Sequence, residues 1–355
     1  MTWDVALILL TDGLANGAVY LLAGLGLVLI FSVTRVVFVP FGDIAAFAAL
    51  SLAAFETDRV PPTIGMVAVL AALALATEVG SLLRRGEAKR IPKAVLMWGV
   101  LPAIPCVLAW LAARPGVPVA VHIAVAVLLV VPIAPLLARV VFQPIADASV
   151  LVLLIVSLAL HFLLSGLGLL FFGPEGSRTT PLTSAVFTLS DGFTVSGQVV
   201  LMVGAAIVLS GLFFLVFERT VAGKALRATA VNRVGARLVG IRPVRTALLA
   251  YGCASLLAGL IGVLIAPVTT MYYDSGFIIG LKAFVAAIIG GLVSYPMTAV
   301  GALAVGVVES FASFWSGALK DVIVFSLLIP VLMLRSFMAA HAEEEEDEEI
   351  GRAHV

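Results

Sequence analysis

Long apolar stretches, separated by short polar breaks, account for most of this chain. A helix needs about 20 apolar residues to cross the hydrocarbon core of a bilayer, and most of these stretches approach or reach that length. The apolar runs, divided where polar, glycine and proline residues interrupt them, predict about 9–11 crossings. The candidates are residues 5–33, 37–55, 63–83, 94–113, 117–138, 150–172, 198–217, 246–267, 279–293, 298–316 and 321–338.

The candidate at 279–293 is shorter than the others. It ends at Gly290-Gly291, and Pro296 follows soon after. Glycine and proline interrupt regular helices, so we expect a half-span or a re-entrant element here.

Composition restricts the fold class further. The chain of 355 residues is 62% hydrophobic and 12% charged, whereas soluble domains are nearer half apolar and about a quarter charged. In lipid only helices and closed barrels satisfy every backbone N–H and C=O, and the short alternating segments of a barrel are absent from the sequence. The sequence therefore predicts an all-α, polytopic transmembrane helix bundle.

Two loops carry 12 of the 21 Lys and Arg residues, and an even number of candidate spans separates them. The positive-inside rule predicts that both loops are cytoplasmic. The N-terminus and the 173–197 loop are then outside, and the C-terminus is cytoplasmic. The basic residues are Arg84, Arg85, Lys89, Arg90 and Lys93 in one loop, and Arg219, Lys224, Arg227, Arg233, Arg237, Arg242 and Arg245 in the other.

We expect one transmembrane domain over residues 1–338 and a disordered cytoplasmic tail over 339–355. Residues 343–349 hold seven of the 21 acidic side chains, and such a run is normally solvated. Contact between this tail and the basic loops is the alternative.

Ionisable residues inside apolar runs are costly, so each is a functional hypothesis. They are Asp43, Glu78, Lys282 and Glu309, whereas Lys320 and Asp321 are expected at an interface, with Asp321 as a helix cap or first-turn acid. His122 and His161 favour core or pore-lining positions over metal binding, and Cys106 and Cys253 favour core positions. No zinc spacing and no hydrolase signature is present, which argues against an enzyme.

Residues 223–245 contain six Lys and Arg residues and no carboxylate, and they lie between two apolar runs. Such a segment is expected to meet another molecule, and a basic anchor facing lipid headgroups is the alternative. Gly223-Lys224 is not a phosphate-binding loop, because the upstream glycine is missing and Ala225 follows. We therefore expect no cofactor on this chain, and any ATP to be bound by a partner.

The C-terminal third resembles the permease subunits of branched-chain amino acid ABC importers, the LivH/LivM type. Weaker similarity occurs at Asn16-Gly17 with Tyr20, at 142–145 and at 173–178. The main matching positions are 223–228, Ala236, Gly240, Ile241, 281–291, Ser294, Gly301, Gly306, Glu309, 320–322 and 325–329.

The resemblance implies a passive, multi-pass pore-forming subunit in the cell (inner) membrane, for branched-chain or related hydrophobic amino acids. Its expected partners are a second permease subunit in a homo- or heterodimer, two cytoplasmic ABC ATPases, an extracytoplasmic solute-binding protein and the lipid bilayer, with no nucleic acid. Within the cytoplasmic loop 218–245, residues 223–241 match the coupling helix that docks into the ATPase. The implied coupling residues are Gly223, Lys224, Arg227, Ala228, Asn232, Arg233, Arg237, Gly240 and Ile241.

A translocation pathway is expected between the first, second, eighth and ninth spans. Its candidate residues are Asn16, Tyr20, Asp43, Lys282, Phe284, Gly290, Gly291 and Glu309. Structural ion pairing or snorkelling to the interface is the alternative for Asp43, Lys282 and Glu309.

The chain also departs from the family pattern. Val231-Asn232 replaces an acid or amide pair, and only the Gly-acid ending of a common family motif survives, at Gly42-Asp43. Residues 56–115 have the character of an insertion with two extra spans.

The alternative function is an ion-coupled secondary transporter of small organic solutes, which broken helices and midplane acids would suit.

Overall fold

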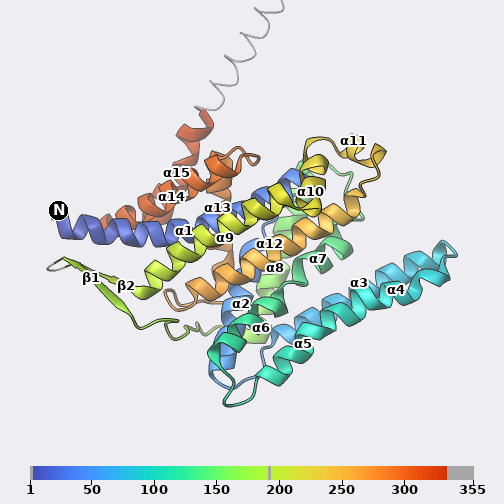
Figure 1. Ribbon diagram of the computed structural model, residues 1–355, viewed down its shortest axis with the longest axis horizontal. Helices are drawn as coiled ribbons and strands as arrows, with labels where there is room; N and C mark the ends of the chain where they lie inside the picture. The colour runs from blue at the N-terminus through green and yellow to red at the C-terminus, as the bar shows by residue number, and fades with distance from the viewer. Residues whose placement is uncertain (1–2, 191–192, 334–355) are drawn as a thin grey trace, which may run out of the picture.

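The computed structural model describes residues 3–190 and 193–333 and is built almost entirely of helices (Figure 1). The acidic tail 339–355 and the end of the last candidate span, 334–338, lie outside the described residues. The elements are α1 (Trp3–Thr34), α2 (Phe41–Glu56), α3 (Thr63–Arg84), η1 (Ala88–Arg90), α4 (Ile91–Val95), η2 (Leu96–Val100), α5 (Leu101–Ala112), α6 (Val119–Val130), α7 (Ile133–Leu137), η3 (Ala138–Phe142), α8 (Val150–Phe172), β1 (Val186–Ser190), β2 (Phe193–Ser196), α9 (Gly197–Arg219), α10 (Val221–Val231), α11 (Arg233–Leu238), α12 (Pro243–Ile265), α13 (Ser275–Ile289), α14 (Tyr295–Trp315) and α15 (Lys320–Ser326).

Within the described residues, eight helical segments are long and apolar enough to cross a membrane. This confirms the all-α membrane bundle, but the number is smaller than the 9–11 crossings predicted. The candidates at 37–55 and 279–293 form the shorter helices α2, of 16 residues, and α13, of 15 residues. At 1.5 Å per residue they reach ~24 Å and ~23 Å, less than the ~30 Å of a bilayer core. The candidate at 321–338 begins as the seven-residue helix α15 and continues beyond the described residues.

The helices form an inner group and an outer group. In α1, 83% of the most apolar stretch is buried, and in α12 67%, against 28% in α3 and α8 and 11% in α9. Helix α2 is buried along nearly its whole length and packs on α12 and α13. The inner group therefore contains α1, α2, α12 and α13, which are the four spans predicted to line a pathway.

Close packing of α14 on the inner helix α1 depends on glycine at specific crossings. Helix α14 runs antiparallel to α1, and Gly306 fits against Gly13 and Gly17. A Cβ atom on Gly306 would lie 2.3 Å from the backbone nitrogen of Gly17, so no larger residue fits without separating the helices. Such small-residue contacts let membrane helices approach closely.

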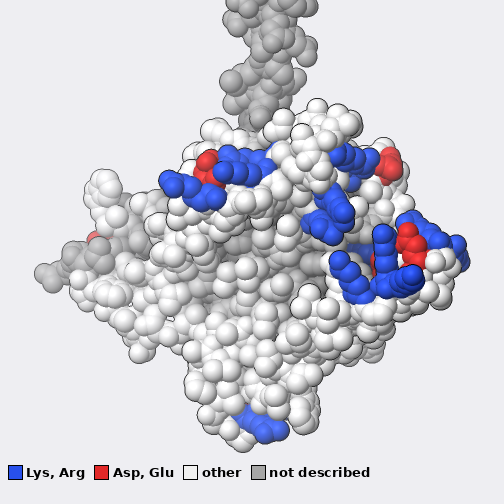
Figure 2. Space-filling model, turned by 45° about the vertical axis from the view of Figure 1, so that its right-hand side comes forward, with Lys and Arg blue, Asp and Glu red and all other residues white. Residues whose placement is uncertain are grey.

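The two basic loops lie at one end of the long helices. In Figure 1 the α3–α4 connection and the α10–α11 segment are both on the right, while the N-terminal end of α1 and the β1–β2 hairpin are on the left. Figure 2 shows Lys and Arg gathered over the upper and right-hand parts of the visible face. The antiparallel pairing of β1 with β2 is an addition to the sequence analysis, which treated 173–197 as a loop.

Candidate functional site

The N-terminal ends of the short helices α2 and α13 meet at a crossing of glycines. A Cβ atom on Gly42 would lie 1.8 Å from the carbonyl oxygen of Gly276, and one on Gly276 would lie 2.5 Å from the carbonyl carbon of Gly42. Helix α2 starts after Pro40, which fixes the backbone at its N-cap position, and α13 starts after the non-helical segment 266–274. Broken helices whose N-termini meet inside a bundle commonly form solute sites in transporters.

Asp43 lies beside this crossing, in the first turn of α2, and is fully buried. Its two carboxylate oxygens lie 2.9 and 2.8 Å from Nδ1 of His161 on α8. The imidazole stacks on Phe277 of α13 with a centroid distance of 4.6 Å. A buried carboxylate needs such a partner, because burying an unpaired charge is costly. His161 was predicted to be a core or pore-lining residue, and its partnership with Asp43 was not predicted.

Three of the predicted pathway residues form a second buried network. Nζ of Lys282 on α13 donates to Oε1 of Glu309 on α14 at 2.5 Å, and the Tyr20 hydroxyl on α1 donates to Oε2 of Glu309 at 2.6 Å. Lys282 is 3% exposed and Glu309 7%. Structural ion pairing was the alternative considered for both residues, and the geometry satisfies it. The network joins α1, α13 and α14.

Asp321 adds a second carboxylate to this network. It lies in the first turn of α15, as predicted, and its Oδ1 is 2.9 Å from Nζ of Lys282. The Asp321 side chain is 39% exposed, whereas the other members are buried. Lys282 therefore joins α13 to both α14 and α15, and one carboxylate charge is in excess when all three groups are ionised.

The remaining predicted pathway residues are not brought together with these two clusters by any hydrogen bond in the described residues. Asn16 is half-buried in α1, and Phe284 is half-buried against the main core. Gly290 and Gly291 form the turn that ends α13, where Gly291 has a φ of +70° and Gly290 packs on Thr298 of α14. Their positions indicate a structural role in joining α13 to α14.

Glu78, which was also predicted to lie in a span, belongs to α3 and forms an ion pair with Arg139 of η3. Arg139 in turn donates to Oε1 of Gln143 at 2.8 Å. This pair joins α3 to the end of the α6–η3 span, away from the two clusters described above.

The predicted coupling segment forms two helices instead of the single helix expected. Asn232 separates α10 from α11, because its backbone is extended and its Oδ1 accepts a hydrogen bond from the N–H of Gly235 at 2.8 Å. This is an N-cap contact, which starts a new helix. Gly240 ends α11 with a φ of +85°, and the N–H of Ile241 returns to the carbonyl of Ala236, as in a Schellman cap.

The buried Gly223 and the exposed Arg227 both fix α10 against the end of α9. A Cβ atom on Gly223 would lie 2.5 Å from the Cα of Phe217. Arg227 donates to the Phe217 carbonyl at 2.9 Å and to Glu218 at 2.8 Å. Both residues were predicted to contact the ATPase, and the structure gives them contacts within the chain.

The outer face of α10 and α11 is exposed and combines apolar and basic side chains. Val231 is 88% exposed, Val234 67%, Leu238 83% and Val239 76%. Lys224, Asn232, Arg237 and Gly240 are exposed, and Ala228, Arg233 and Ile241 are half-buried. We call Val231, Val234, Arg237, Leu238 and Val239 the α10–α11 face. Exposed apolar patches rimmed by polar residues mark interaction surfaces.

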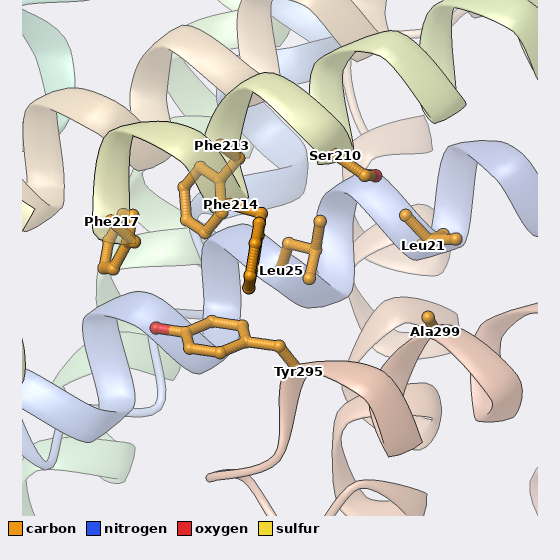
Figure 3. Close-up of a pocket in the computed structure, with 8 residues that line it drawn as sticks. All are labelled: Leu21, Leu25, Ser210, Phe213, Phe214, Phe217, Tyr295 and Ala299. Carbon is orange, nitrogen blue, oxygen red and sulfur yellow. The ribbon is translucent and has the colours of Figure 1, made fainter. Parts of the chain in front are cut away.

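An apolar cavity of about 190 Å³ lies between α1, α9 and α14. Figure 3 shows Phe213 and Phe217 of α9 above Tyr295 of α14, with Leu21 and Leu25 of α1 beside them. None of the predicted pathway residues lines this cavity, so it does not mark the predicted pathway. Among the described residues, no group of three or more His, Cys, Asp and Glu side chains could hold a metal ion.

Comparison with known proteins agrees with these features. Residues 94–332 match the family described as the branched-chain amino acid transport system permease component. The chain is 32% identical over 209 residues to the permease protein LivH of Salmonella typhimurium and, equally, to LivH of Escherichia coli K12, covering 55% of this chain and 66% of each relative. It is 29% identical over 204 residues to BraD of Pseudomonas aeruginosa, covering 56% of this chain and 66% of BraD. No solved structure matches the chain.

The helical membrane bundle and the family match define a multi-pass membrane protein of the transport permease class. The chain belongs to the branched-chain amino acid transport permease family. The resemblance inferred from the motifs in the C-terminal third is therefore confirmed. The aligned segments span about two-thirds of the curated relatives, 66% in LivH and BraD.

Proposed function

We propose that this chain is the membrane-spanning permease subunit of an ATP-driven importer for branched-chain or related hydrophobic amino acids. The observation that carries the proposal is the α10–α11 face, a rigidly capped surface between two spans with Leu238 83% exposed among basic side chains. A chain without a nucleotide-binding loop needs such a surface to receive energy from a separate ATPase. A second permease subunit and an extracytoplasmic solute-binding protein complete the proposed importer.

The proposed coupling route runs from the α10–α11 face to the inner helices. Leu226 of α10 packs in a small buried cluster with Phe217 of α9, Leu29 and Val33 of α1, and Ala250 of α12. Arg227 and Gly223 hold α10 to α9, so α10 cannot move independently of the bundle. A movement of the α10–α11 face would therefore be transmitted to α1 and α12. Rigid helix shifts of this kind can alternate access to a pathway.

The same proposal includes the membrane orientation and the domain organisation. Both basic loops are placed in the cytoplasm by the positive-inside rule, and the N-terminus is placed outside. Residues 1–338 are proposed to form the permease domain, with the helical hairpin of α3 and α5 as part of an insertion over 56–115. Residues 339–355 are proposed to be a cytoplasmic tail.

Co-purification tests the proposal directly. The full chain, affinity-purified from its native membrane, should retain ATPase subunits and a second permease. The double variant Arg237→Glu/Leu238→Glu should lose most of the ATPase, because it places two carboxylates on the α10–α11 face. The matched control is Arg85→Glu in the other basic loop, which should retain the ATPase. Retention of the ATPase by the double variant would contradict the proposed docking surface.

A secondary transporter is the second candidate, favoured by one observation. The short helices α2 and α13 meet beside a buried carboxylate, Asp43, which is an arrangement that ion-coupled transporters use. Proteoliposomes that contain this chain alone distinguish the two. Leucine uptake driven by a proton or sodium gradient without ATPase would favour the second candidate, and uptake that needs ATPase and ATP would favour the importer.

A further inference from the structure

A cavity of about 340 Å³ opens at the end of the bundle that carries the β-hairpin, opposite the basic loops. It lies between the end of α2, the 57–62 connection, the end of α8 and residues 177–178. Its volume falls at the lower end of the range for small-molecule sites, about 300–1,000 Å³. The side chains that give it chemical character are Leu50, Glu56, Arg59, Phe171, Phe172 and Arg178.

Two arginines supply the positive side of this cavity. Arg178 is fixed, because its Nε donates to the carbonyl oxygen of Pro267 at 2.8 Å. That bond leaves the terminal guanidinium nitrogens of Arg178 without another hydrogen bond in the part of the chain that the structure describes. The Arg59 side chain makes no hydrogen bond or ion pair there either. Arginine presents paired N–H donors that fit a carboxylate in a bidentate manner.

One carboxylate faces the same cavity. Glu56 accepts hydrogen bonds from the backbone N–H of Thr180 at 3.0 Å and from the Thr180 hydroxyl at 2.9 Å. These bonds fix its position and leave acceptor capacity, since an ionised carboxylate has about four lone-pair sites. The lining therefore carries two positive charges and one negative charge. Asp58 and Glu175 are exposed nearby in the sequence but are not part of the lining.

Most of the remaining lining residues are apolar, and Thr57 and Ser177 add two hydroxyl groups. Leu50, Phe171 and Phe172 belong to this apolar part, and Phe172 stacks on the buried Phe47 with a centroid distance of 5.9 Å. Val60 and Pro62 also line the cavity. A site that combines a fixed acid, two arginines and an apolar wall is complementary to a zwitterion with an apolar side chain.

The cavity is also connected to both short helices. Glu56 is the last residue of α2, and Ser177 pairs by two backbone hydrogen bonds with Met271 in the segment that leads into α13. The Arg178 contact to Pro267 joins the same segment. A molecule bound here would contact the end of α2 and residues 177–178, which are hydrogen-bonded to the segment that leads into α13.

We propose that this cavity is an outer binding site for an α-amino acid with an apolar side chain. Arg59 and Arg178 bind the carboxylate, Glu56 accepts the ammonium group, and Leu50, Phe171 and Phe172 contact the side chain. The choice of a hydrophobic amino acid as the ligand rests on the proposed import function, to which this site adds a place where the substrate binds. Binding is a property of this chain alone, so it can be measured without the ATPase.

The test is saturation-transfer NMR and competition with L-leucine on the purified full chain in nanodiscs. Leucine should bind, leucinamide and isocaproate should compete poorly, and Arg59→Gln should weaken leucine binding about tenfold, the loss of one charged hydrogen-bond pair. The Arg59 side chain makes no hydrogen bond or ion pair within the described residues, and its replacement keeps the backbone bond to Ala54, so folding should stay intact. The control Arg114→Gln removes an exposed arginine that contacts Trp110 and does not line the cavity.

Absence of leucine binding, or leucine binding that Arg59→Gln and Arg178→Gln leave unchanged, would overturn the site. A loss of solute-binding-protein attachment in Arg59→Gln with unchanged leucine binding would also overturn it, in favour of an acidic protein surface. A failure of the proposed import function is detected by a different experiment: uptake by the reconstituted complex would then proceed without ATP. Leucine binding that depends on Arg59 in that case would still support the site.

Discussion

Lys282 and Glu309 show why isolated charges in apolar sequence are informative. Each charge is too costly to bury alone, so its presence in an apolar run predicts a partner. The sequence could not name the partners, because Lys282 and Glu309 are 27 positions apart, and Asp43 and His161 are 118 apart. Asp321 was assigned correctly to a first helical turn, but its approach to Lys282 depends on where α15 packs.

We expect Glu309→Leu to destabilise the protein by about 3 kcal/mol, because it leaves the buried Lys282 ammonium without its closest counterion. The double variant Lys282→Met/Glu309→Leu should be more stable than Glu309→Leu alone, since both buried charges are then removed. Thermal unfolding of the purified variants measures both effects. Glu87→Leu is the control, because its ion pair with Arg90 is exposed and should contribute at most about 1 kcal/mol. A double variant no more stable than the single one would show that the pair is not coupled.

At the scale of elements, the crossing of α2 and α13 depends on two glycines that carry no side chain.

Most of the long spans were predictable within a few residues, since their length and hydropathy are local properties. The short length of α2 was not predicted, because the turn before Pro40 is itself apolar and resembles a continuing span. The break at Asn232 was missed for a related reason: one capping side chain divides an otherwise helix-prone segment.

The crossing yields a prediction for Gly42. A valine at Gly42 would place its Cβ 1.8 Å from the Gly276 carbonyl oxygen, so α2 and α13 would have to separate. Overpacking of this kind costs typically about 1–3 kcal/mol, and we expect a lower melting temperature together with reduced leucine uptake. Gly65→Ala in α3 is the matched control, because no atom lies within 4 Å of the added Cβ. Equal stability of Gly42→Val and the parent protein would contradict the crossing.

At the scale of the whole molecule, the arrangement places both basic loops at one end and the β-hairpin with the amino-acid cavity at the other. This arrangement agrees with the even number of candidate spans counted between the loops from the apolar runs. The end at which each loop lies follows from helix packing, whereas the side of the membrane follows only from the positive-inside rule. The proposed functions of the two ends, amino-acid binding and ATPase docking, require that they face opposite compartments.

Cysteine labelling decides the orientation. In a background with Cys106→Ala and Cys253→Ala, single cysteines are introduced at three exposed positions: Arg85 and Val239 at the basic end, and Thr188 in the hairpin. A membrane-impermeant maleimide should label Thr188→Cys in intact cells and should label Arg85→Cys and Val239→Cys only in inverted vesicles. The parent without cysteines is the control for background labelling. Labelling of Val239→Cys in intact cells would place the α10–α11 face outside and exclude a cytoplasmic ATPase as its partner.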